Sequence, residues 1–360
     1  MQKPLVSILC PTFNHEKYVK FFLDSLLAQT NPNWELLIVD DCSTDNNVAE
    51  IKKFHDSRIK LIQNPFNMGI NCGLNQAFER ARGDYMCFCA SDDMLLPDYV
   101  DNVLTTFKNN PGKGIVYCDL QQMDENNKII KDSILRNQNI DRYQILKHLF
   151  MIGNSMMSPG MAMKRDLFKK IMPLTITLSQ YQDYKMHIDL LLTSDYVLMD
   201  KISMLYRRPS TKSGISVRNN TTMRTCELEE NVLMNSFLAI HDVKTLEKIF
   251  GKDLEQFGTI TKNIIPYILG TLAMQSNIEY KQIWGYNQIV SFISDIKNYE
   301  LLNKKYGFCY RDFLNLTKKF DMSVFFKKYS RYKKLFNIMT TVSAVMLILT
   351  LFLMFSLILR

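Results

Sequence analysis

The chain has 360 residues, 47% of them hydrophobic and 22% charged, with only 13 Gly and 10 Pro, and this composition excludes collagen-like, low-complexity and disordered proteins. The formal net charge is +8, but seven basic residues against one acid fall between Lys318 and Lys334, and the rest of the chain is close to neutral. A near-neutral body without a basic stripe argues against DNA or RNA as the main partner.

From residue 4 to about residue 120, short β-forming apolar runs alternate with helical stretches. The expected strands are 5–11, 35–40, 58–64, 84–90 and 114–120, and the expected helices end at Ala28, His55, Arg82 and Asn109. This alternation is typical of an α/β fold with a mostly parallel central sheet.

The alternation weakens after residue 120. Residues 141–207 are expected to form helices interrupted by a turn at 158–160 and to end in a strand, and the pattern from about residue 220 is helical. We therefore predict three parts: an α/β domain over 1–219, a helical region over 220–335 that ends in a basic juxtamembrane segment, and a transmembrane helix over 336–359.

The transmembrane prediction depends on 24 consecutive residues without a charge, 336–359. At about 1.5 Å per residue they reach about 36 Å, enough to cross a hydrocarbon core about 30 Å thick. A buried core helix and an in-plane helix are the alternatives. The basic residues from Lys327 to Lys334 favour the cytoplasmic side for the preceding flank, so we expect a single-pass protein of the cytoplasmic membrane with its body in the cytoplasm.

Pairs of acids follow two of the expected strands, where ligands bind in open α/β sheets. Asp40 and Asp41 end the second strand, and Asp92 and Asp93 follow the fourth. Because adjacent carboxylates repel each other, a divalent cation is expected at Asp92 and Asp93; it would bridge a diphosphate and neutralise the charge that develops as the diphosphate leaves. The alternatives are an Asp cap at the second pair and, after the first pair, a turn and helix cap formed by residues 43–45.

Seven motifs in order resemble the inverting family-2-type glycosyltransferases, whose nucleotide-sugar-binding domain has the GT-A fold. The resemblance covers roughly residues 4–216 and implies a GT-A-like domain here. The motifs are SILCPTFNHEKYV, ELLIVDDCSTDN, NPFNMGINCGLNQAFERARGDY, SDD, SPGMAMKRDLF, QDYKMHIDLL and LYRRPSTKSGIS.

The resemblance implies how the nucleotide-sugar donor is bound. Pro11, Thr12 and Asp40 would hold the nucleobase, with Asp40 accepting a hydrogen bond from a base N–H. Asn67 and Gly69 would shape the donor pocket.

The resemblance also implies the chemistry of transfer. Asp93 would be a direct ligand of Mg or Mn, and Asp92 would lie nearer the ribose or the metal. Asp183 matches the general base, which an inverting transfer needs beside the acceptor hydroxyl; alternatively it caps a helix. Arg207 would hold the diphosphate, or else it is a surface arginine.

Three positions depart from the family pattern. Ala90 stands where many members carry a further acid, Lys185 where another acid is frequent, and Pro209 where a histidine is common. With Ala90, fewer carboxylates would hold the metal, which would change its affinity. Lys185 and Pro209 would alter the contacts with the acceptor or the diphosphate.

The expected protein is a membrane-anchored hexosyltransferase of the bacterial surface-polysaccharide type. It would move a sugar with inversion from a nucleotide-diphosphate donor, for which UDP is expected, to a hydroxyl of a lipid-linked saccharide at the cytoplasmic membrane face. Two alternatives are a polyprenyl-phosphate glycosyltransferase and a catalytically degenerate GT-A scaffold.

Overall fold

The structure is a computed structural model that describes residues 6–131, 140–208, 219–319, 330–343 and 346. The chain divides into two compact units, residues 1–292 and residues 293–360. The first unit contains the sheet and the site described below.

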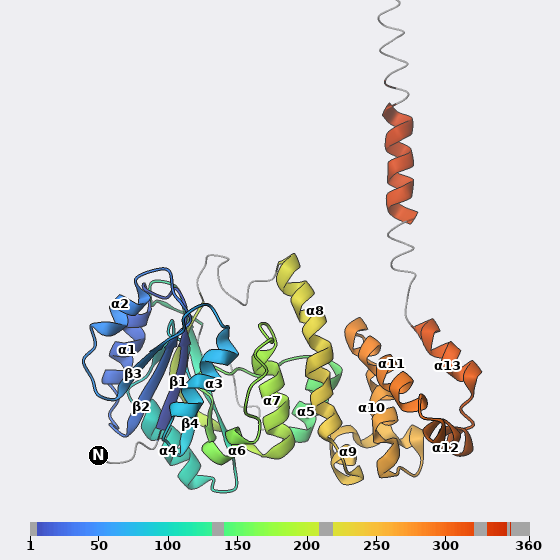
Figure 1. The fold of residues 1–360 in the computed structure, drawn as a ribbon, viewed down its shortest axis with the longest axis horizontal. Helices are drawn as coiled ribbons and strands as arrows, with labels where there is room; N and C mark the ends of the chain where they lie inside the picture. Colours follow the sequence, from blue (N-terminus) through green and yellow to red (C-terminus); the bar gives the residue numbers. More distant parts are fainter. Residues whose placement is uncertain (1–5, 132–139, 209–218, 320–329, 344–345, 347–360) are drawn as a thin grey trace, which may run out of the picture. The chain divides into compact units, whose positions relative to one another are not determined.

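One mixed sheet forms the centre of the first unit (Figure 1). In their order across the sheet the strands are β3 (Ile59–Gln63), β2 (Trp34–Asp40), β1 (Val6–Thr12), β4 (Tyr85–Phe88), β8 (Ala162–Lys164), β6 (Ile115–Met123), β9 (Tyr196–Arg207) and β5 (Met94–Leu95), with β7 (Ile129–Lys131) paired to β6. Strands β1 to β4 are parallel, as predicted. Beyond them β6 and β9 are also parallel, whereas the short strands β8, β5 and β7 pair antiparallel with their neighbours, so the sheet is mixed, with its longest pairings parallel.

The change of direction follows from the turn before β8. Gly160 has φ +69°, and an added Cβ would lie 2.6 Å from Cys118 Sγ. The chain thus reverses at a position that favours glycine, and the three residues of β8 then fit between β4 and β6. The sequence does not predict β8 or its register, because a strand of three residues is too short to show a periodic pattern.

Helices cover the sheet, and their order follows the alternation in the sequence (Figure 1). They are α1 (Val19–Leu27), α2 (Asn47–Lys52), α3 (Ile70–Arg80), α4 (Tyr99–Asn109), α5 (Arg142–Met151), α6 (Arg165–Lys169) and α7 (Gln182–Thr193). Strand β2 is buried along its whole length, with Ile38 packed in a core shared with Phe22 of α1 and Val103 of α4. Burial on both faces explains why these strands read as continuous apolar runs.

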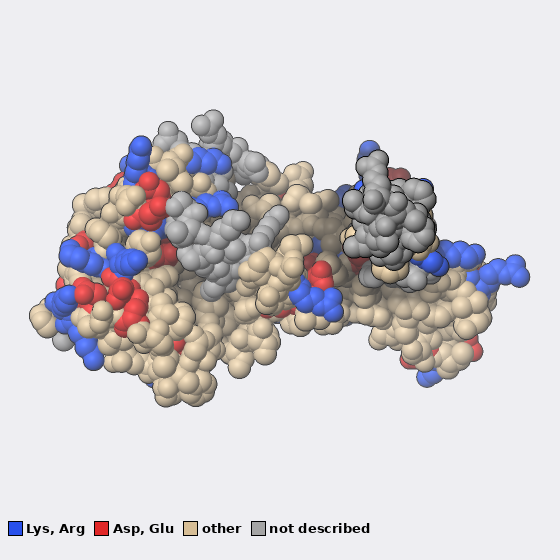
Figure 2. Space-filling model, turned by 90° about the horizontal axis from the view of Figure 1, so that it is seen from above, with Lys and Arg blue, Asp and Glu red and all other residues tan. Residues whose placement is uncertain are grey.

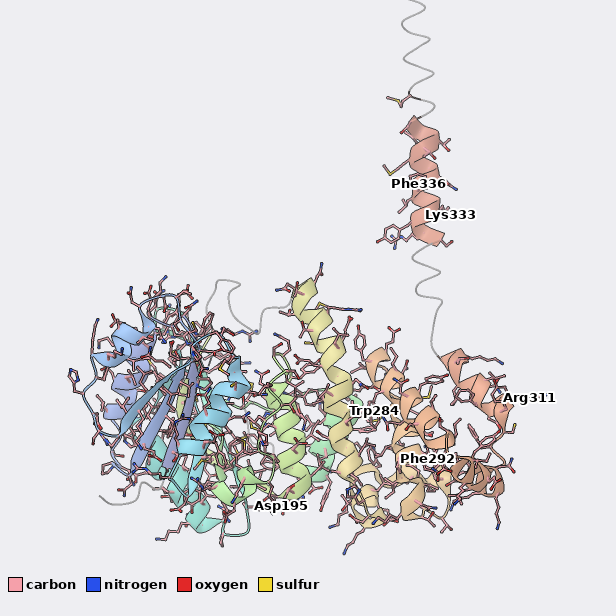
Figure 3. All side chains as sticks on the ribbon, viewed as in Figure 1. Asp195, Trp284, Phe292, Arg311, Lys333 and Phe336 are labelled. Atoms are coloured by element: carbon pink, nitrogen blue, oxygen red, sulfur yellow. The ribbon has the colours of Figure 1, made fainter. Side chains whose placement is uncertain are left out.

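The first unit continues with α8 (Asn220–Met234), α9 (Val243–Phe250), α10 (Ile265–Ala273) and α11 (Glu279–Ile293). Trp284 of α11, labelled in Figure 3, donates a hydrogen bond from Nε1 to Asn235 Oδ1 at 2.9 Å. Its ring also lies edge-on to Phe150 of α5, with centroids 6.1 Å apart. These helices therefore share a core with the α/β part of the chain instead of folding apart from it.

The second unit contains α12 (Ile296–Tyr306), α13 (Tyr310–Leu316) and helical residues 330–343. Within the described part of the chain, no helix is both long enough and apolar enough to cross a membrane. Most of the predicted transmembrane segment, 336–359, lies outside the described residues. The membrane helix and the membrane location thus remain predictions.

Charges of both signs are interspersed on the face shown in Figure 2, over the end of the molecule that carries β1 to β3. Two basic residues of this part of the chain share one buried acid. Lys60 and Arg82 both contact the buried carboxylate of Glu35, at 3.1 and 3.0 Å. No large field of one sign covers the described part of this face.

Candidate active site

The carboxyl ends of β1 and β2 meet at one edge of the sheet, with Thr12 paired to Asp40. Their side chains are buried and joined through Asn47, whose Nδ2 donates to Thr12 Oγ1 at 3.0 Å and to Asp40 Oδ1 at 2.8 Å. Ser91 Oγ donates to Thr12 Oγ1 at 2.7 Å and lies 2.7 Å from Nδ1 of His15. A continuous hydrogen-bonded chain thus connects the ends of β1 and β2 with the acidic segment that follows β4.

The two acids at the end of β2 have separate roles in the fold. Asp40 also accepts hydrogen bonds from Ser43 N at 3.0 Å and Ser43 Oγ at 2.5 Å, so both of its oxygens already bind protein donors. Asp41 accepts from the backbone N–H groups of Met68 at 2.7 Å and Gly69 at 2.8 Å. The structure therefore ties Asp41 to the predicted donor loop, in which Asn67 is exposed.

Gly69 supplies the turn that this loop needs. Its φ is +84°, in the region that favours glycine, and it immediately precedes α3. Pro11, the other backbone position predicted at the donor pocket, lies within β1 and is half-buried.

Asp93 is the most deeply buried of the predicted metal ligands, with 1% of its surface exposed. Its Oδ1 accepts from the backbone N–H of Arg207 at 2.8 Å, whereas its buried Oδ2 has no hydrogen-bond partner among the described residues. Burial, reinforced by the negative charge of Asp92, raises the pKa of Asp93 well above its usual range. A buried carboxylate oxygen of this kind would be satisfied by a cation.

The donor set is small. In the described parts of the chain, no group of three or more Asp, Glu, His or Cys side chains is arranged to hold a metal ion. Asp92 lies beside Asp93 and is partly exposed, with Oδ1 4.0 Å from His15 Nδ1. Two carboxylates fit Mg²⁺ when substrate phosphates and waters complete its shell, which is the usual way that Mg²⁺ is bound.

Arg207, at the end of β9, is buried, with 2% of its surface exposed. Its guanidinium donates to Asp92 O at 2.7 Å, Asp124 O at 2.8 Å and Asn127 Oδ1 at 2.7 Å, and it lies over the ring of Tyr18 at 4.6 Å. Burial lowers the pKa of Arg207. The residue is thus no surface arginine; it fixes the acidic segment to the turn between β6 and β7.

Asp183 lies in the first turn of α7 and is half-buried, while Tyr181 occupies the cap position. Its Oδ1 accepts from Tyr184 N at 2.6 Å, and its Oδ2 accepts from Asn154 Nδ2 at 3.4 Å. Burial outweighs these bonds and raises the pKa of Asp183 to about 6. The side chain is a carboxylate that takes up a proton near neutral pH, which suits a general base.

Tyr206 precedes Arg207 in β9 and is partly buried. Burial raises the pKa of Tyr206, and the negative charges of Asp93, Asp92 and Asp183 act in the same direction.

Residues 7–172 match the family model described as Glycosyl transferase family 2. The α/β part of this chain is thus similar to the family 2 glycosyltransferases. Sequence relatives include an uncharacterized glycosyltransferase of Haemophilus influenzae, 26% identical over 256 residues that cover 69% of this chain and 81% of the relative. Another is the Escherichia coli UDP-Glc:alpha-D-GlcNAc-diphosphoundecaprenol beta-1,3-glucosyltransferase WfgD, 38% identical over 111 residues that cover 31% of this chain and 44% of the relative.

A similar solved structure is that of Staphylococcus aureus TarS 1–349 in complex with UDP. Its TM-score is 0.57 at 15% identity, and the match covers 79% of this chain and 89% of TarS 1–349. At this identity the likeness concerns the fold alone. It extends the comparison beyond the matched family segment into the helices that follow.

Of the positions that depart from the family pattern, Lys185 has a charged partner. Lys185 forms an ion pair with Asp189 at 2.6 Å, and Pro209 lies outside the described residues. His187, close to Asp183 in sequence, is fully buried with Nδ1 2.9 Å from Tyr117 Oη, and burial lowers its pKa to about 3. His187 is therefore a neutral structural residue.

Sequence reasoning missed several residues that organise the site. His15 and Asn47 lie in polar stretches with no pattern of their own, and only the fold brings them to Ser91 and Asp40. Asn154 lies in the stretch after α5 and reaches Asp183 across the site. A single sequence carries no signal for such long-range contacts.

Proposed function

We propose that the protein is a metal-dependent, inverting hexosyltransferase that moves a sugar from UDP to a hydroxyl of a lipid-linked saccharide at the cytoplasmic face of the membrane. The observation that carries the proposal is the buried carboxylate of Asp93, whose Oδ2 has no hydrogen-bond partner among the described residues. It would offer the diphosphate a cation site, and Asp183 in the first turn of α7 would offer the acceptor a base.

The donor side rests on the acids after β4. Asp93 and Asp92 would hold Mg²⁺ or Mn²⁺, which when bound neutralises the charge that develops on the departing diphosphate. The loop that Asp41 fixes, with Asn67 and Gly69, would line the sugar nucleotide. UDP in the TarS complex and UDP-Glc in the name of WfgD support UDP as the carrier.

The acceptor side rests on Asp183. Its carboxylate would take the proton of the acceptor hydroxyl while the acceptor oxygen bonds to the anomeric carbon and the bond from that carbon to the diphosphate oxygen breaks. One attack from the face opposite the leaving group inverts the anomeric centre and requires no covalent enzyme intermediate. The diphosphate departs with the bonding electrons.

A lipid-linked acceptor is supported by two observations. WfgD is named for a diphosphoundecaprenol substrate, and this chain carries the basic cluster and uncharged segment expected of a membrane anchor. An anchor that holds the domain at the bilayer raises the effective concentration of a lipid substrate.

The test is transfer by the full chain in detergent, with radiolabelled UDP-glucose or UDP-N-acetylglucosamine and a bacterial polyprenol-linked lipid extract. We expect label in the lipid fraction with wild type and none with Asp183→Asn. Full activity of Asp183→Asn would instead favour polyprenyl phosphate as acceptor, because a phosphate oxygen is already ionised and needs no base. Absence of turnover by wild type would favour a scaffold without activity.

A further inference from the structure

The chain between α6 and α7 leads into the helix that carries Asp183, and α3 holds the first part of it. Asn75 and Leu174 form two hydrogen bonds. Asn75 Nδ2 donates to the carbonyl oxygen of Leu174 at 3.0 Å, and the backbone N–H of Leu174 donates to Asn75 Oδ1 at 2.8 Å. Asn71 Nδ2 donates to Thr175 O at 2.7 Å. Because α3 begins directly after the donor loop, this end of the connection is fixed to the donor side of the site.

Glu229 of α8 holds the other end. Its buried carboxylate accepts four hydrogen bonds: Ser179 N at 2.7 Å and Ser179 Oγ at 2.9 Å reach Oε1, and Gln180 N at 3.0 Å and Tyr181 N at 2.8 Å reach Oε2. The last of these donors stands two residues before Asp183 and directly before the first residue of α7.

These contacts place a carboxylate directly before α7, whose own cap position supplies no side-chain hydrogen bond. A helix leaves its first N–H groups without intrahelical partners, and a negative charge near them is favourable. Tyr181 at the cap position makes no side-chain hydrogen bond to the helix. A carboxylate from a neighbouring helix therefore fixes the backbone that enters α7, and Figure 1 shows α8 beside α7.

Glu230, the next residue of α8, is linked through Lys281 to the first turn of α7. Glu230 is buried and forms an ion pair with Lys281 of α11 at 3.1 Å. The same ammonium donates to Tyr184 Oη at 3.1 Å and to Leu149 O at 2.8 Å. Asp183 therefore lies between two points, Tyr181 and Tyr184, that are both held from the helices after residue 219.

We propose that Glu229 is a positioning residue: it fixes the start of α7 and so holds the carboxylate of Asp183 at the acceptor position. The inference rests on the proposed role of Asp183 as the base. It makes α8 and α11 part of the active site of the enzyme, although they lie outside the matched family segment. The acids after β4, on which donor binding depends, make no contact with Glu229.

The test compares Glu229→Gln, Glu229→Asp and Glu227→Gln in the full chain. Glutamine replaces one acceptor oxygen with an NH₂ donor that faces backbone N–H groups, whereas aspartate retains both acceptors. Glu227 is the matched control, since it lies on the same helix but contacts Arg224 and Tyr280. Turnover is followed as UDP release from UDP-glucose or UDP-N-acetylglucosamine with water as acceptor.

For Glu229→Gln we expect kcat to fall about 10²-fold, the loss typical of a displaced catalytic group, with an unchanged KM for the UDP-sugar. Manganese-dependent UDP binding should also be unchanged, and amide exchange should become faster at residues 179–184. Glu229→Asp should recover part of kcat, and Glu227→Gln should match wild type.

Three results would overturn the inference. If Glu229→Gln has the same kcat as Glu227→Gln while Asp183→Asn is inactive, Glu229 has no positioning role, but Asp183 is still supported as the base. A rise in KM together with loss of UDP binding in both Glu229 variants would show a general structural role. Full activity of Asp183→Asn would overturn the proposed base and its positioning together.

Discussion

Carboxylates of one chemical type do different work in this site because their surroundings differ. Asp41 is held by backbone N–H groups and orders a loop, whereas Asp93 is buried with one oxygen lacking a described partner. Asp183 is half-buried, and desolvation raises its pKa to about 6. The environment of each side chain thus separates an ordering residue from the proposed cation ligand and the proposed base.

The pKa of Asp183 predicts how turnover depends on pH. The base must be ionised, and a raised pKa means that the ionised form is lost as pH falls through about 6. The rate of UDP release should therefore rise with pH through about 6 and level off above it. Asp183→Asn should remove this limb, and initial rates across the range test it; a flat wild-type profile would exclude Asp183 as the base.

Arg207 gives a prediction about stability. Lysine cannot reproduce a forked set of hydrogen bonds to Asp124 O and Asn127 Oδ1. Because each bond from a charged donor contributes about 1.5–3 kcal/mol, Arg207→Lys should lower the free energy of unfolding by roughly 2–4 kcal/mol. Urea denaturation measures this, with exposed Arg208→Lys as control; equal midpoints for the two variants would contradict it.

The residue types at the site were readable from the sequence, but their orientations were not. Acids at strand ends predicted Asp92, Asp93 and the edge at which they lie. The side chain of Asp40, in contrast, is occupied by Ser43 and Asn47. Hydrogen bonds between distant segments decide such orientations, and a linear pattern does not encode them.

At the scale of elements, predictability followed strand length. β1, β2 and β4 were predicted because buried parallel strands read as continuous apolar runs. β5 and β8, with two and three residues, carry no such pattern, and they add the antiparallel pairings with β9, β4 and β6. The positions of β5 and β8 are set by tight turns and by hydrogen bonds to neighbouring strands.

The turn before β8 is therefore a sensitive point. Alanine at Gly160 would adopt a strained positive φ, and its Cβ would lie 2.6 Å from Cys118 Sγ and 2.9 Å from Met204 Sδ. Gly160→Ala should destabilise the protein by roughly 1–3 kcal/mol, the usual cost of such strain. Gly153→Ala, with open space around the added carbon, is the control in thermal unfolding. Equal melting temperatures for Gly160→Ala and Gly153→Ala would show that position 160 does not require glycine.

In the molecule as a whole, the helices α8 to α11 belong to the unit that contains the sheet. Phe150 of α5 packs edge-on against Phe237 and Phe250, with centroids 4.9 Å apart in each pair. The sequence predicted helices here, but it gave no sign that they complete the core behind α5 and α7.

Truncation tests this organisation. Residues 1–292 should unfold in one cooperative transition and bind UDP, because they contain a complete unit. Residues 1–219 should aggregate, since Phe150 and its neighbours would be exposed to water. Soluble yield and thermal unfolding compare the two; a soluble, cooperatively folded 1–219 fragment would contradict the account.

The central claim is that the acids after β4 bind a divalent cation together with a nucleoside diphosphate. Calorimetric titration of the full chain with UDP, GDP and dTDP, each with and without Mn²⁺, tests it most directly beside Asp93→Ala. We predict binding of UDP that requires the metal and is lost in Asp93→Ala, which would fix the carrier and the cation site at once. Failure of a folded protein to bind any of the three, or equal binding by Asp93→Ala, would contradict the claim.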